Sequence, residues 1–289
     1  MRCFLLVMAF AGSWFLSSAA QARPPQLLLD VARFRNLNQV EKGAEVELYV
    51  TVPTQSLTYR QRAPRAFQAA ATVTLEVLRA DGKPTYREVV VLKPPVINDT
   101  TMALKNSLSF LKRLQLPDGR YTLRGTVRDQ YRSANGEAIV ERTLVLEAPA
   151  GPALSDVVLL ARPAVKSNGD DAFLRGGYLL TRAPNGFFGR GADNLYFYTE
   201  LKGAPAGQAL RLHYHLAAPD GTAADADAAL TPVAGRPTIV VGQLPFGPMP
   251  TGDFTLLVDV YSGKKLLTSH RAAGRRSTTD YAPAGAVPQ

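Results

Sequence analysis

The amino-acid sequence predicts an all-β protein made of two tandem immunoglobulin-like or fibronectin-type antiparallel β-sandwiches. Apolar and polar residues alternate over many short runs, and turn dipeptides such as Asp81-Gly82 and Asp220-Gly221 separate these runs. The same order of runs and turns recurs in both halves, as expected for two copies of a sandwich built from short strands. The 289 residues, 46% hydrophobic and 20% charged, exclude collagen, coiled coils and a wholly disordered chain.

Residues 1–22 are predicted to form a cleaved secretory signal peptide. Arg2 precedes an apolar run from Cys3 to Leu16, and the small-residue site Ala20-Gln21-Ala22 follows. Cys3 begins the apolar run rather than ending it, so it is poorly placed to accept a lipid. No later run approaches the roughly 18 apolar residues of a membrane span. We therefore expect a soluble product in the periplasm or outside the cell.

Cleavage would remove Cys3 and Trp14, the only cysteine and the only tryptophan of the chain. A mature protein without cysteine has no disulfides, no Cys₄ zinc site and no thiol catalysis. Because Arg2 is the only charged residue of the signal, cleavage lowers the formal net charge by one from +9. This basic balance favours anionic partners such as acidic glycans, lipid headgroups or acidic proteins, or it reflects a soluble surface that is simply basic.

The first sandwich is predicted over residues 23–149. Its clearest strands are the alternating runs 45–52, 72–77 and 121–128. In an antiparallel sheet, one face of such a strand packs on the core and the other face meets water. We therefore expect Val46 and its neighbours of the same parity in the core, and Glu45 and Glu47 in water.

Residues 104–116 fit two patterns. Leu104, Leu108 and Leu111 have helical spacing, whereas Leu108, Phe110, Leu114 and Leu116 fit a strand. The strand is preferred because the corresponding segment of the second half, residues 237–241, is rich in β-branched residues and poorly suited to a helix.

The second sandwich is predicted over residues 152–270, after a short stiff linker at residues 148–152. Its clearest strands are the runs 210–216 and 254–260. Residues 271–289 lack periodicity and are expected to form a disordered tail.

An internal repeat links the two halves. Residues 116–123, Leu-Pro-Asp-Gly-Arg-Tyr-Thr-Leu, match residues 249–256, Met-Pro-Thr-Gly-Asp-Phe-Thr-Leu. In each copy a Gly-x-aromatic sequence opens a late strand. This resembles the aromatic corner of immunoglobulin-like sandwiches, and a buried aromatic at a strand start is the other interpretation.

Several of these segments resemble the secreted bacterial GWxTD-domain proteins. The similarity lies in residues 46–53 with Ser56-Leu57-Thr58-Tyr59, in residues 116–123 and in residues 194–200, and it covers roughly Leu27 to Thr268. The motif that names the family needs a tryptophan, which the mature chain lacks. The resemblance therefore implies the N-terminal sandwich pair without the GWxTD domain. It implies an extracytoplasmic location and no established activity.

The sequence motifs argue against an enzyme and against a cofactor. A serine triad needs a base that is almost always histidine, and the chain has only His213, His215 and His270. No Gly-x-Ser-x-Gly elbow, Walker loop, HExxH helix or strand-linked GxGxxG sequence is present. The sequence leaves open a catalytic pair of carboxylates that the fold brings together from distant loops.

One weak metal-binding pattern is present. His213 and His215 are two residues apart on a predicted strand and so share a face. If that strand pairs with residues 254–260, Asp259 would join them in a site of two histidines and one carboxylate. Two solvated histidines are the simpler interpretation, and no metal site is assigned.

The best binding candidate is the loop 185–191, which contains Phe187, Phe188 and Arg190. Two aromatic rings in a glycine-rich loop suggest a contact with a partner, with Arg190 holding an anionic group. Packing of the rings against a sandwich is the alternative.

Two further loops carry weaker patterns. Residues 59–65 form a basic loop that is either solvated or touches an acidic cell-surface polymer, and an exported protein is not expected to bind nucleic acid. Asn98-Asp99-Thr100 and Asp99-Thr100-Thr101 match glycosylation patterns or form a simple turn.

Together these observations predict an exported, non-enzymatic interaction or structural module of the cell envelope. Its expected partner is an envelope protein or an anionic glycan. The alternatives are an anionic-glycan-binding module and a periplasmic chaperone-like protein, which would need an unpaired apolar strand edge and a basic cleft.

Overall fold

The computed structural model describes residues 24–35, 43–100, 107–134, 136–221 and 223–279. These residues form β-strands joined by turns and two 3₁₀ segments, η2 (Thr54–Ser56) and η3 (Pro184–Gly186), with no α-helix among them. No helix in the described ranges is long and apolar enough to cross a membrane. The predicted signal peptide, including Cys3 and Trp14, lies outside the described residues.

The strands of the first half are β1 (Leu28–Arg35), β2 (Ala44–Val52), β3 (Arg60–Ala63), β4 (Ala66–Gln68), β5 (Ala71–Arg79), β6 (Pro84–Leu92), β7 (Leu108–Leu116), β8 (Gly119–Asp129) and β9 (Glu137–Leu146). They form a three-stranded sheet in the order β1-β2-β7 and a four-stranded sheet in the order β6-β5-β8-β9, with β3 and β4 as a separate hairpin. All pairings within these sheets are antiparallel. Alternate residues such as Val46, Leu75 and Leu123 fill the core between the two sheets.

The strands of the second half are β10 (Ala153–Leu154), β11 (Val158–Leu160), β12 (Val165–Lys166), β13 (Leu174–Arg175), β14 (Tyr178–Leu179), β15 (Phe187–Phe188), β16 (Asn194–Lys202), β17 (Leu210–Ala217), β18 (Ala223–Leu230), β19 (Thr238–Pro245), β20 (Gly252–Ser262) and β21 (Lys265–Arg276). One sheet has β16 at its centre, paired with β10, β11 and β19, and the other runs β15-β21-β20-β17-β18. A small sheet, β12-β14-β13, is added at the side.

The two halves share one topology, which confirms the fold class and the internal repeat. In the first half β5 pairs with β6 and β8, and β8 pairs with β9. In the second half β17 pairs with β18 and β20, and β20 pairs with β21. Likewise β2 pairs with β1 and β7, as β16 pairs with β11 and β19.

The repeated Gly-x-aromatic sequence lies at the same corner of each sandwich. Tyr121 near the start of β8 donates a hydrogen bond from its hydroxyl to the Pro117 carbonyl at 3.0 Å, which is the tyrosine corner of this class of fold. The equivalent residue of β20, Phe254, has no hydroxyl and instead packs edge-on against Phe246 with ring centroids 5.0 Å apart. The first copy thus uses a hydrogen bond where the second uses ring packing.

Two sequence-based assignments are settled by the strand boundaries. The ambiguous segment is a strand, β7, over its described part, and its counterpart β19 is a strand as well. The prediction of a disordered tail from residue 271 is wrong for residues 271–276, which complete β21. The pattern was missed because the inward positions of this stretch are the small residues Ala272 and Gly274, and the Phe254 ring fits closely against Gly274. Residues 280–289 lie outside the described residues.

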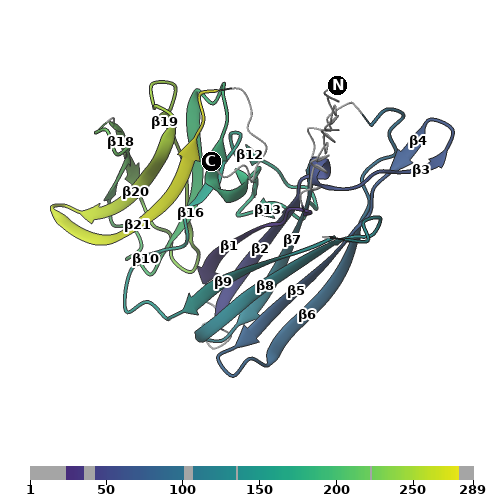
Figure 1. The fold of residues 1–289 in the computed structure, drawn as a ribbon. Helices are drawn as coiled ribbons and strands as arrows, with labels where there is room; N and C mark the ends of the chain where they lie inside the picture. The colour runs from purple at the N-terminus through teal and green to yellow at the C-terminus, as the bar shows by residue number, and fades with distance from the viewer. Residues whose placement is uncertain (1–23, 36–42, 101–106, 135, 222, 280–289) are drawn as a thin grey trace, which may run out of the picture.

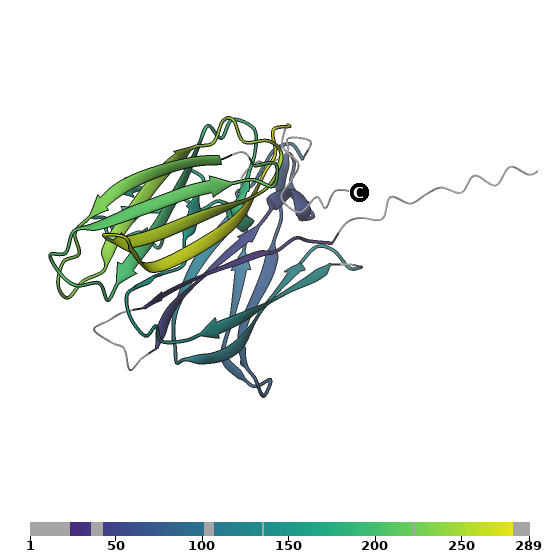
Figure 2. The ribbon, with the colours of Figure 1, turned by 90° about the vertical axis from the view of Figure 1, so that its left-hand side faces the viewer.

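Four sheets are stacked through the molecule (Figure 1 and Figure 2). The sheets with β2 and β16 lie in the middle and face each other across an apolar cluster that includes Phe34, Tyr49 and Tyr198. The expectation that the polar face of β2 meets water is therefore wrong: Glu47 is fully buried and Tyr49 and Thr51 are nearly so. Both faces of β2 are covered, one by its own core and one by the second sandwich.

Candidate interdomain site

The junction between the sandwiches contains the most unusual polar chemistry of the described residues. Arg175 is placed there by a tight hairpin, in which Gly176 and Gly177 join β13 to β14 with φ values of +55° and +79°. Two positive φ values in a two-residue turn are typical of a type I′ turn, which favours glycine. A Cβ atom at Gly176 would lie 2.3 Å from the Tyr198 hydroxyl, so glycine is also needed for close approach to β16.

Arg175 joins three carboxylates from both sandwiches. Its Nη1 lies 2.7 Å from Glu45 Oε1 and 2.9 Å from Glu47 Oε1 on β2, and its Nε lies 2.7 Å from Glu200 Oε1 on β16. The guanidinium also stacks over the Phe34 ring, 3.4 Å from its centroid. The planar fork of arginine suits this multiple pairing, and the ring below it excludes water from one side.

Two further cations complete the cluster. Arg113 on β7 donates from Nε to Glu47 Oε1 at 2.8 Å and from Nη2 to the Leu174 carbonyl at 2.8 Å, which crosses the junction a second time. The Nζ of Lys202, a residue only 7% exposed, lies 3.2 Å from Glu200 Oε2. Three carboxylates therefore face three cations, so the net charge of the buried cluster is zero.

The pKa shifts follow from this pairing. Burial opposes ionisation of Glu47, but the positive charge of Arg175, the Tyr49 hydroxyl and Arg113 outweigh it and hold its pKa below the ordinary value. Burial, followed by the negative charge of Glu47, raises the pKa of Tyr49. Burial lowers the pKa of Lys202, and Glu200 opposes that change. Glu47 is thus kept as a permanent anion, which suits a structural ion pair better than a proton donor.

A second ion pair crosses the junction at its other end. Arg33 on β1 and Asp156 before β11 are joined by Nε–Oδ2 and Nη2–Oδ1 contacts of 2.9 Å and 2.8 Å. Their backbones also bond, from Asp156 N to the Arg33 carbonyl at 3.1 Å. His270 on β21 lies beside this pair, with Nε2 3.4 Å from Asp156 Oδ1. Burial and the charge of Arg33 lower the pKa of His270, whereas Asp156 opposes them.

An open cleft of about 750 Å³ borders the Arg175 cluster. Its walls come from both sandwiches and include Glu45, Arg113 and Lys202, while Arg236 and Val233 line it from the segment before β19. The charges of the cluster are paired with one another, and Arg236 adds one further cation to the cleft wall.

The predicted binding loop is built differently from the expectation. Phe187 and Phe188 form β15, which pairs in parallel with Arg275 and Arg276 of β21. Phe188 is 5% exposed, with its ring centroid 5.3 Å from that of Phe246 and 5.9 Å from that of Phe254.

The expectation that both rings are free for a partner is therefore wrong for Phe188, which belongs to the core of the second sandwich. Glycine-rich flanks suggested an open loop, but Gly186 instead lets the chain pass close to β21, since a Cβ there would lie 2.9 Å from the Ala273 carbonyl oxygen. Phe187 is partly exposed and Arg190 exposed, and a role for them in binding stays a prediction.

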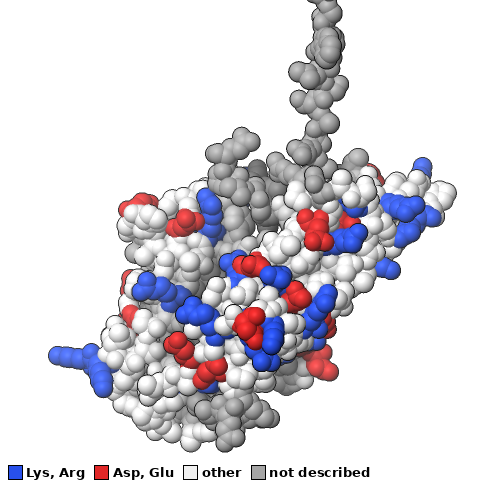
Figure 3. Space-filling view, turned by 60° about the horizontal axis from the view of Figure 1, so that its bottom comes forward, with Lys and Arg blue, Asp and Glu red and all other residues white. Residues whose placement is uncertain are grey.

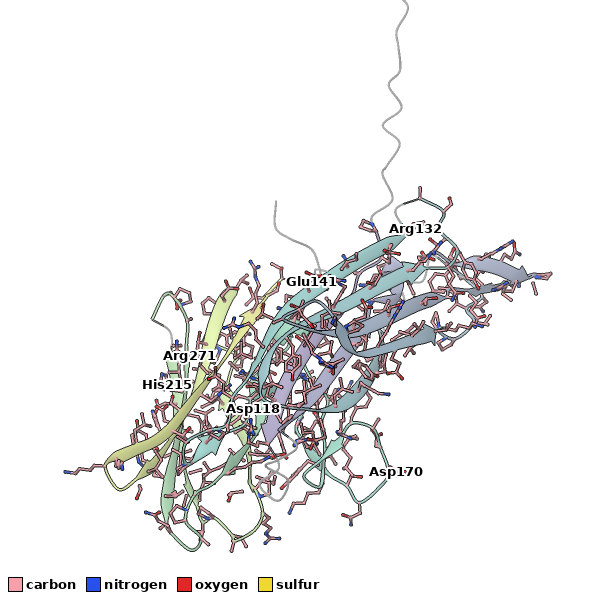
Figure 4. The ribbon with its side chains drawn as sticks, turned by 90° about the horizontal axis from the view of Figure 1, so that it is seen from below. Asp118, Arg132, Glu141, Asp170, His215 and Arg271 are labelled. Carbon is pink, nitrogen blue, oxygen red and sulfur yellow. The ribbon has the colours of Figure 1, made fainter. Side chains whose placement is uncertain are left out.

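The two strand histidines lie on the outer face of the second sandwich. His213 is opposite Asp259 on β20, as the predicted pairing requires, and opposite Asp227 on β18. Its Nδ1 lies 3.3 Å from Asp227 Oδ1, and His215 shares a cross-strand row with Arg271 (Figure 4). Within the described ranges, no group of three or more His, Cys, Asp or Glu side chains is arranged to hold a metal ion.

The basic loop of the first sandwich forms the exposed hairpin β3–β4. Its Arg62 lies over the ring of Tyr131, 4.9 Å from the centroid. On the face seen in Figure 3, Lys and Arg side chains are interspersed with Asp and Glu side chains. That face therefore shows no extended surface of a single sign to match the net positive charge.

The interdomain residues were not singled out as a site from the sequence. In the sequence, Glu45 and Glu47 have the positions of the solvent-facing side of an ordinary strand. Arg175 lies in a stretch without hydrophobic periodicity. One signal was available: in residues 194–202, Tyr196, Tyr198 and Glu200 share the face opposite Leu195 and Phe197, so both faces of that strand carry large aromatic rings.

Comparison with known proteins identifies no family and no activity for this chain. No protein-family model and no curated protein matches the chain. Among solved structures, a β-glucuronidase of Bacteroides uniformis is 12% identical with a TM-score of 0.30, matching 81% of this chain and 26% of its own. Red sea bream transglutaminase is 13% identical with a TM-score of 0.27, matching 88% of this chain and 31% of its own.

A β-glycosidase from Bacteroides vulgatus is 9% identical with a TM-score of 0.27, over 80% of this chain and 25% of its own. The chain thus spans less than a third of the length of each of these proteins. Such low identities and TM-scores carry no argument about activity.

Proposed function

We propose that this chain is an exported, non-enzymatic interaction module of the cell envelope, related to the N-terminal sandwich pair of GWxTD-domain proteins. Its partner is an envelope protein that binds the outer sheet of the first sandwich. The observation that carries the proposal is an exposed row of branched side chains across that sheet.

The row crosses all four strands of the sheet β6-β5-β8-β9. The cross-strand register places Val89, Thr74, Thr126 and Ile139 side by side on the outer face. Val89 is 55% exposed and Ile139 58% exposed, and Val91, two residues along β6 from Val89, is 52% exposed. Exposed apolar side chains on both edge strands of one sheet face, with threonine methyl groups between them, are costly in water and favour a surface that meets a partner.

The next row toward the β5–β6 turn gives this surface a polar border. This row crosses the same four strands and consists of Arg87, Glu76, Arg124 and Glu141. The Nε of Arg124 lies 2.6 Å from Glu141 Oε1. The exposed apolar side chains of the edge strands thus lie beside a row of charged residues, and protein interfaces likewise combine apolar contacts with a polar border. The strands β6 and β9 are also the open edges of the sheet, so a partner strand has backbone groups available to it.

The junction between the sandwiches supports a scaffold role. The ion pairs of Arg175 and Arg33 and the apolar cluster around Phe34 join the sandwiches at several points. Two domains joined in this way present their outer sheets in a fixed relation. This arrangement suits a module that spaces or orients partners.

The partner surface is tested with a photo-crosslinking amino acid introduced at position 89 of the full-length protein in its native cells. The matched control is position 165, where Val165 is 58% exposed on the second sandwich. We expect a discrete crosslinked protein from position 89 that is absent from position 165 and is lost with an added Ile139→Asp change. Equal products from both positions, or none from position 89, would overturn the proposal.

Export is tested separately by fractionation and mass measurement. The proposed product begins at Arg23 and is recovered from the periplasm or the medium. A chain that keeps Met1 and stays in the cytoplasm would contradict export and leave the partner surface to be judged on the crosslinking alone.

A further inference from the structure

The strand β6 leaves one edge of the first sandwich open. Among the described residues β5 is the only strand paired with β6, and Figure 1 shows no other strand beyond its free edge. Every second residue of an edge strand points its N–H and C=O groups away from the sheet, so this edge of nine residues offers backbone donors and acceptors. The inward side chains Tyr86 and Leu92 pack against the core and hold the strand in place.

The other border of the same sheet, β9, is better protected. The Nη1 of Arg33 on β1 donates to the Val145 carbonyl of β9 at 3.2 Å, which fastens this part of β9 to the neighbouring sheet. Proteins also protect edges with proline and with inward charges. In β6 the only proline is Pro84 at the first position, and the inward charge of Glu88 is paired with Lys112 of β7 at 3.0 Å. The middle of β6 is therefore the more accessible edge.

The charges across the outer face stop at this edge with their alternation incomplete. From β9 to β6 the row reads Glu141, Arg124, Glu76 and Arg87, so its signs alternate. Successive side chains approach to 2.6 Å, 3.9 Å and 3.6 Å. Within the part of the chain that the structure describes, Arg124 has a carboxylate on each side, whereas Arg87 has one and its side chain is 65% exposed. An added strand would continue the row with an acidic residue opposite Arg87.

The next positions along β6 extend this pattern. Val89 and Val91 share the outer face with Arg87, and each is more than half exposed. Lys93 follows the strand at the same parity and is exposed as well. The side chains that best match these four positions are acidic, apolar, apolar and acidic. Because this order is the same in both directions, it suits a parallel or an antiparallel neighbour.

We propose that an extended segment of the partner protein, with the pattern acid-x-apolar-x-apolar-x-acid, adds to β6 as a fifth strand of the outer sheet. Backbone hydrogen bonds to β6 hold the segment, and its alternate side chains provide specificity. The formal net charge of +9 also favours an acidic partner. This inference rests on the proposed function, because it states how the envelope protein holds the outer sheet.

The test uses the full chain and the synthetic peptide Thr-Glu-Thr-Val-Thr-Val-Thr-Glu-Thr. The control peptide has lysine in place of both glutamates. Binding is followed by NMR shifts of the β6 amides, with the amides of β18, the edge strand of the second sandwich, as reference. We expect the glutamate peptide to shift the β6 amides and to bind about tenfold more tightly than the lysine peptide at low salt. No shift in β6, or equal binding of the two peptides, overturns the proposal.

Backbone pairing is tested with two N-methylated forms of the glutamate peptide. One is methylated at the glutamates and valines, and the other at the threonines between the first and last residues. In an added strand only one of these alternate sets points its N–H groups at β6. One form should therefore lose binding while the other retains it. Binding by both forms, or by neither, contradicts strand addition.

Arg87→Glu should weaken binding of the glutamate peptide about fivefold and strengthen binding of the lysine peptide. The matched control is Arg211→Glu, because Arg211 is also a half-exposed arginine in a cross-strand ion pair, with Asp227 on the second sandwich. This control should leave binding unchanged, and equal effects of the two changes would contradict the assignment to β6. Sedimentation of the unaltered chain tests a second copy as the occupant. Self-association that Arg87→Glu abolishes would assign the edge to that copy and overturn the proposal.

The strand addition and the proposed function can fail separately. Ile139→Asp should leave peptide binding unchanged, because β9 lies at the opposite edge of the sheet from β6. Failure of the peptide with a crosslinked protein still obtained from position 89 would remove strand addition and keep the outer face as the partner surface. Peptide binding without a crosslinked protein would support the edge and contradict the envelope partner.

Discussion

Arg175 of the second sandwich pairs with Glu47 of the first at 2.9 Å, and Glu47 is completely shielded from solvent. This contact links a hairpin of one domain to the central strand of the other. The flanking partners Glu45, Arg113 and Glu200 satisfy the remaining donors and acceptors of the pair. Burial of so much charge is tolerated because each ion has a partner. Removal of any one member would leave another ion buried without its partner.

Glu47→Gln keeps the shape of the side chain but removes its charge, leaving Arg113 and Arg175 short of a buried carboxylate. We expect a loss of about 3 kcal/mol in the free energy of unfolding, measured by urea denaturation. The control is Glu141→Gln at the residue labelled in Figure 4, which breaks the exposed pair with Arg124 and should cost less than about 1 kcal/mol. Equal effects of the two changes would contradict the buried network.

His270 should make stability depend on pH below its ordinary pKa of 6.5. Burial lowers its pKa in the folded protein, so the unfolded chain takes up a proton that the folded chain does not. The free energy of unfolding is therefore expected to fall as the pH is lowered below 6.5. His270→Gln should remove this part of the slope, whereas His215→Gln on the outer face should retain it. An unchanged slope in His270→Gln would rule this histidine out as the cause.

Phe188→Ala should destabilise the protein by about 3–5 kcal/mol, because the ring fills the core beside Phe246 and Phe254. Phe187→Ala should cost clearly less, since that ring is partly exposed. Thermal unfolding monitored by circular dichroism compares the two variants. A melting temperature for Phe188→Ala close to that of the unaltered protein would place this ring outside the core.

Tyr121→Phe removes the hydrogen bond to the Pro117 carbonyl and nothing else at the corner of the first sandwich. We expect a loss of about 1 kcal/mol, the usual net value of one hydrogen bond. The fold should remain intact, because the second sandwich already has Phe254 at the equivalent place. The spectrum of the variant should match that of the unaltered protein, and a loss of β-structure would show that the corner does more than add one bond.

The strands, their antiparallel order and the duplication were open to prediction because they depend on local patterns. Alternation along residues 45–52 and 210–216 specifies which residues share a face, and turn residues such as Asp81-Gly82 mark where a strand ends. The repeated Pro-x-Gly-x-aromatic sequence marks the same corner in both copies. The structure also pairs His213 with Asp259, which the sequence offered only as a condition, because the pairing of two distant strands is a long-range contact.

What covers each face was decided by the tertiary structure alone. Glu47 and Tyr49 look like water-facing residues in sequence, and only the approach of a second domain turns their face into an interface. Phe188 looked exposed for the converse reason, because its parallel partner Arg276 lies far along the chain. Alternation reports that two faces differ, whereas the neighbour of each face depends on long-range contacts that no local pattern contains.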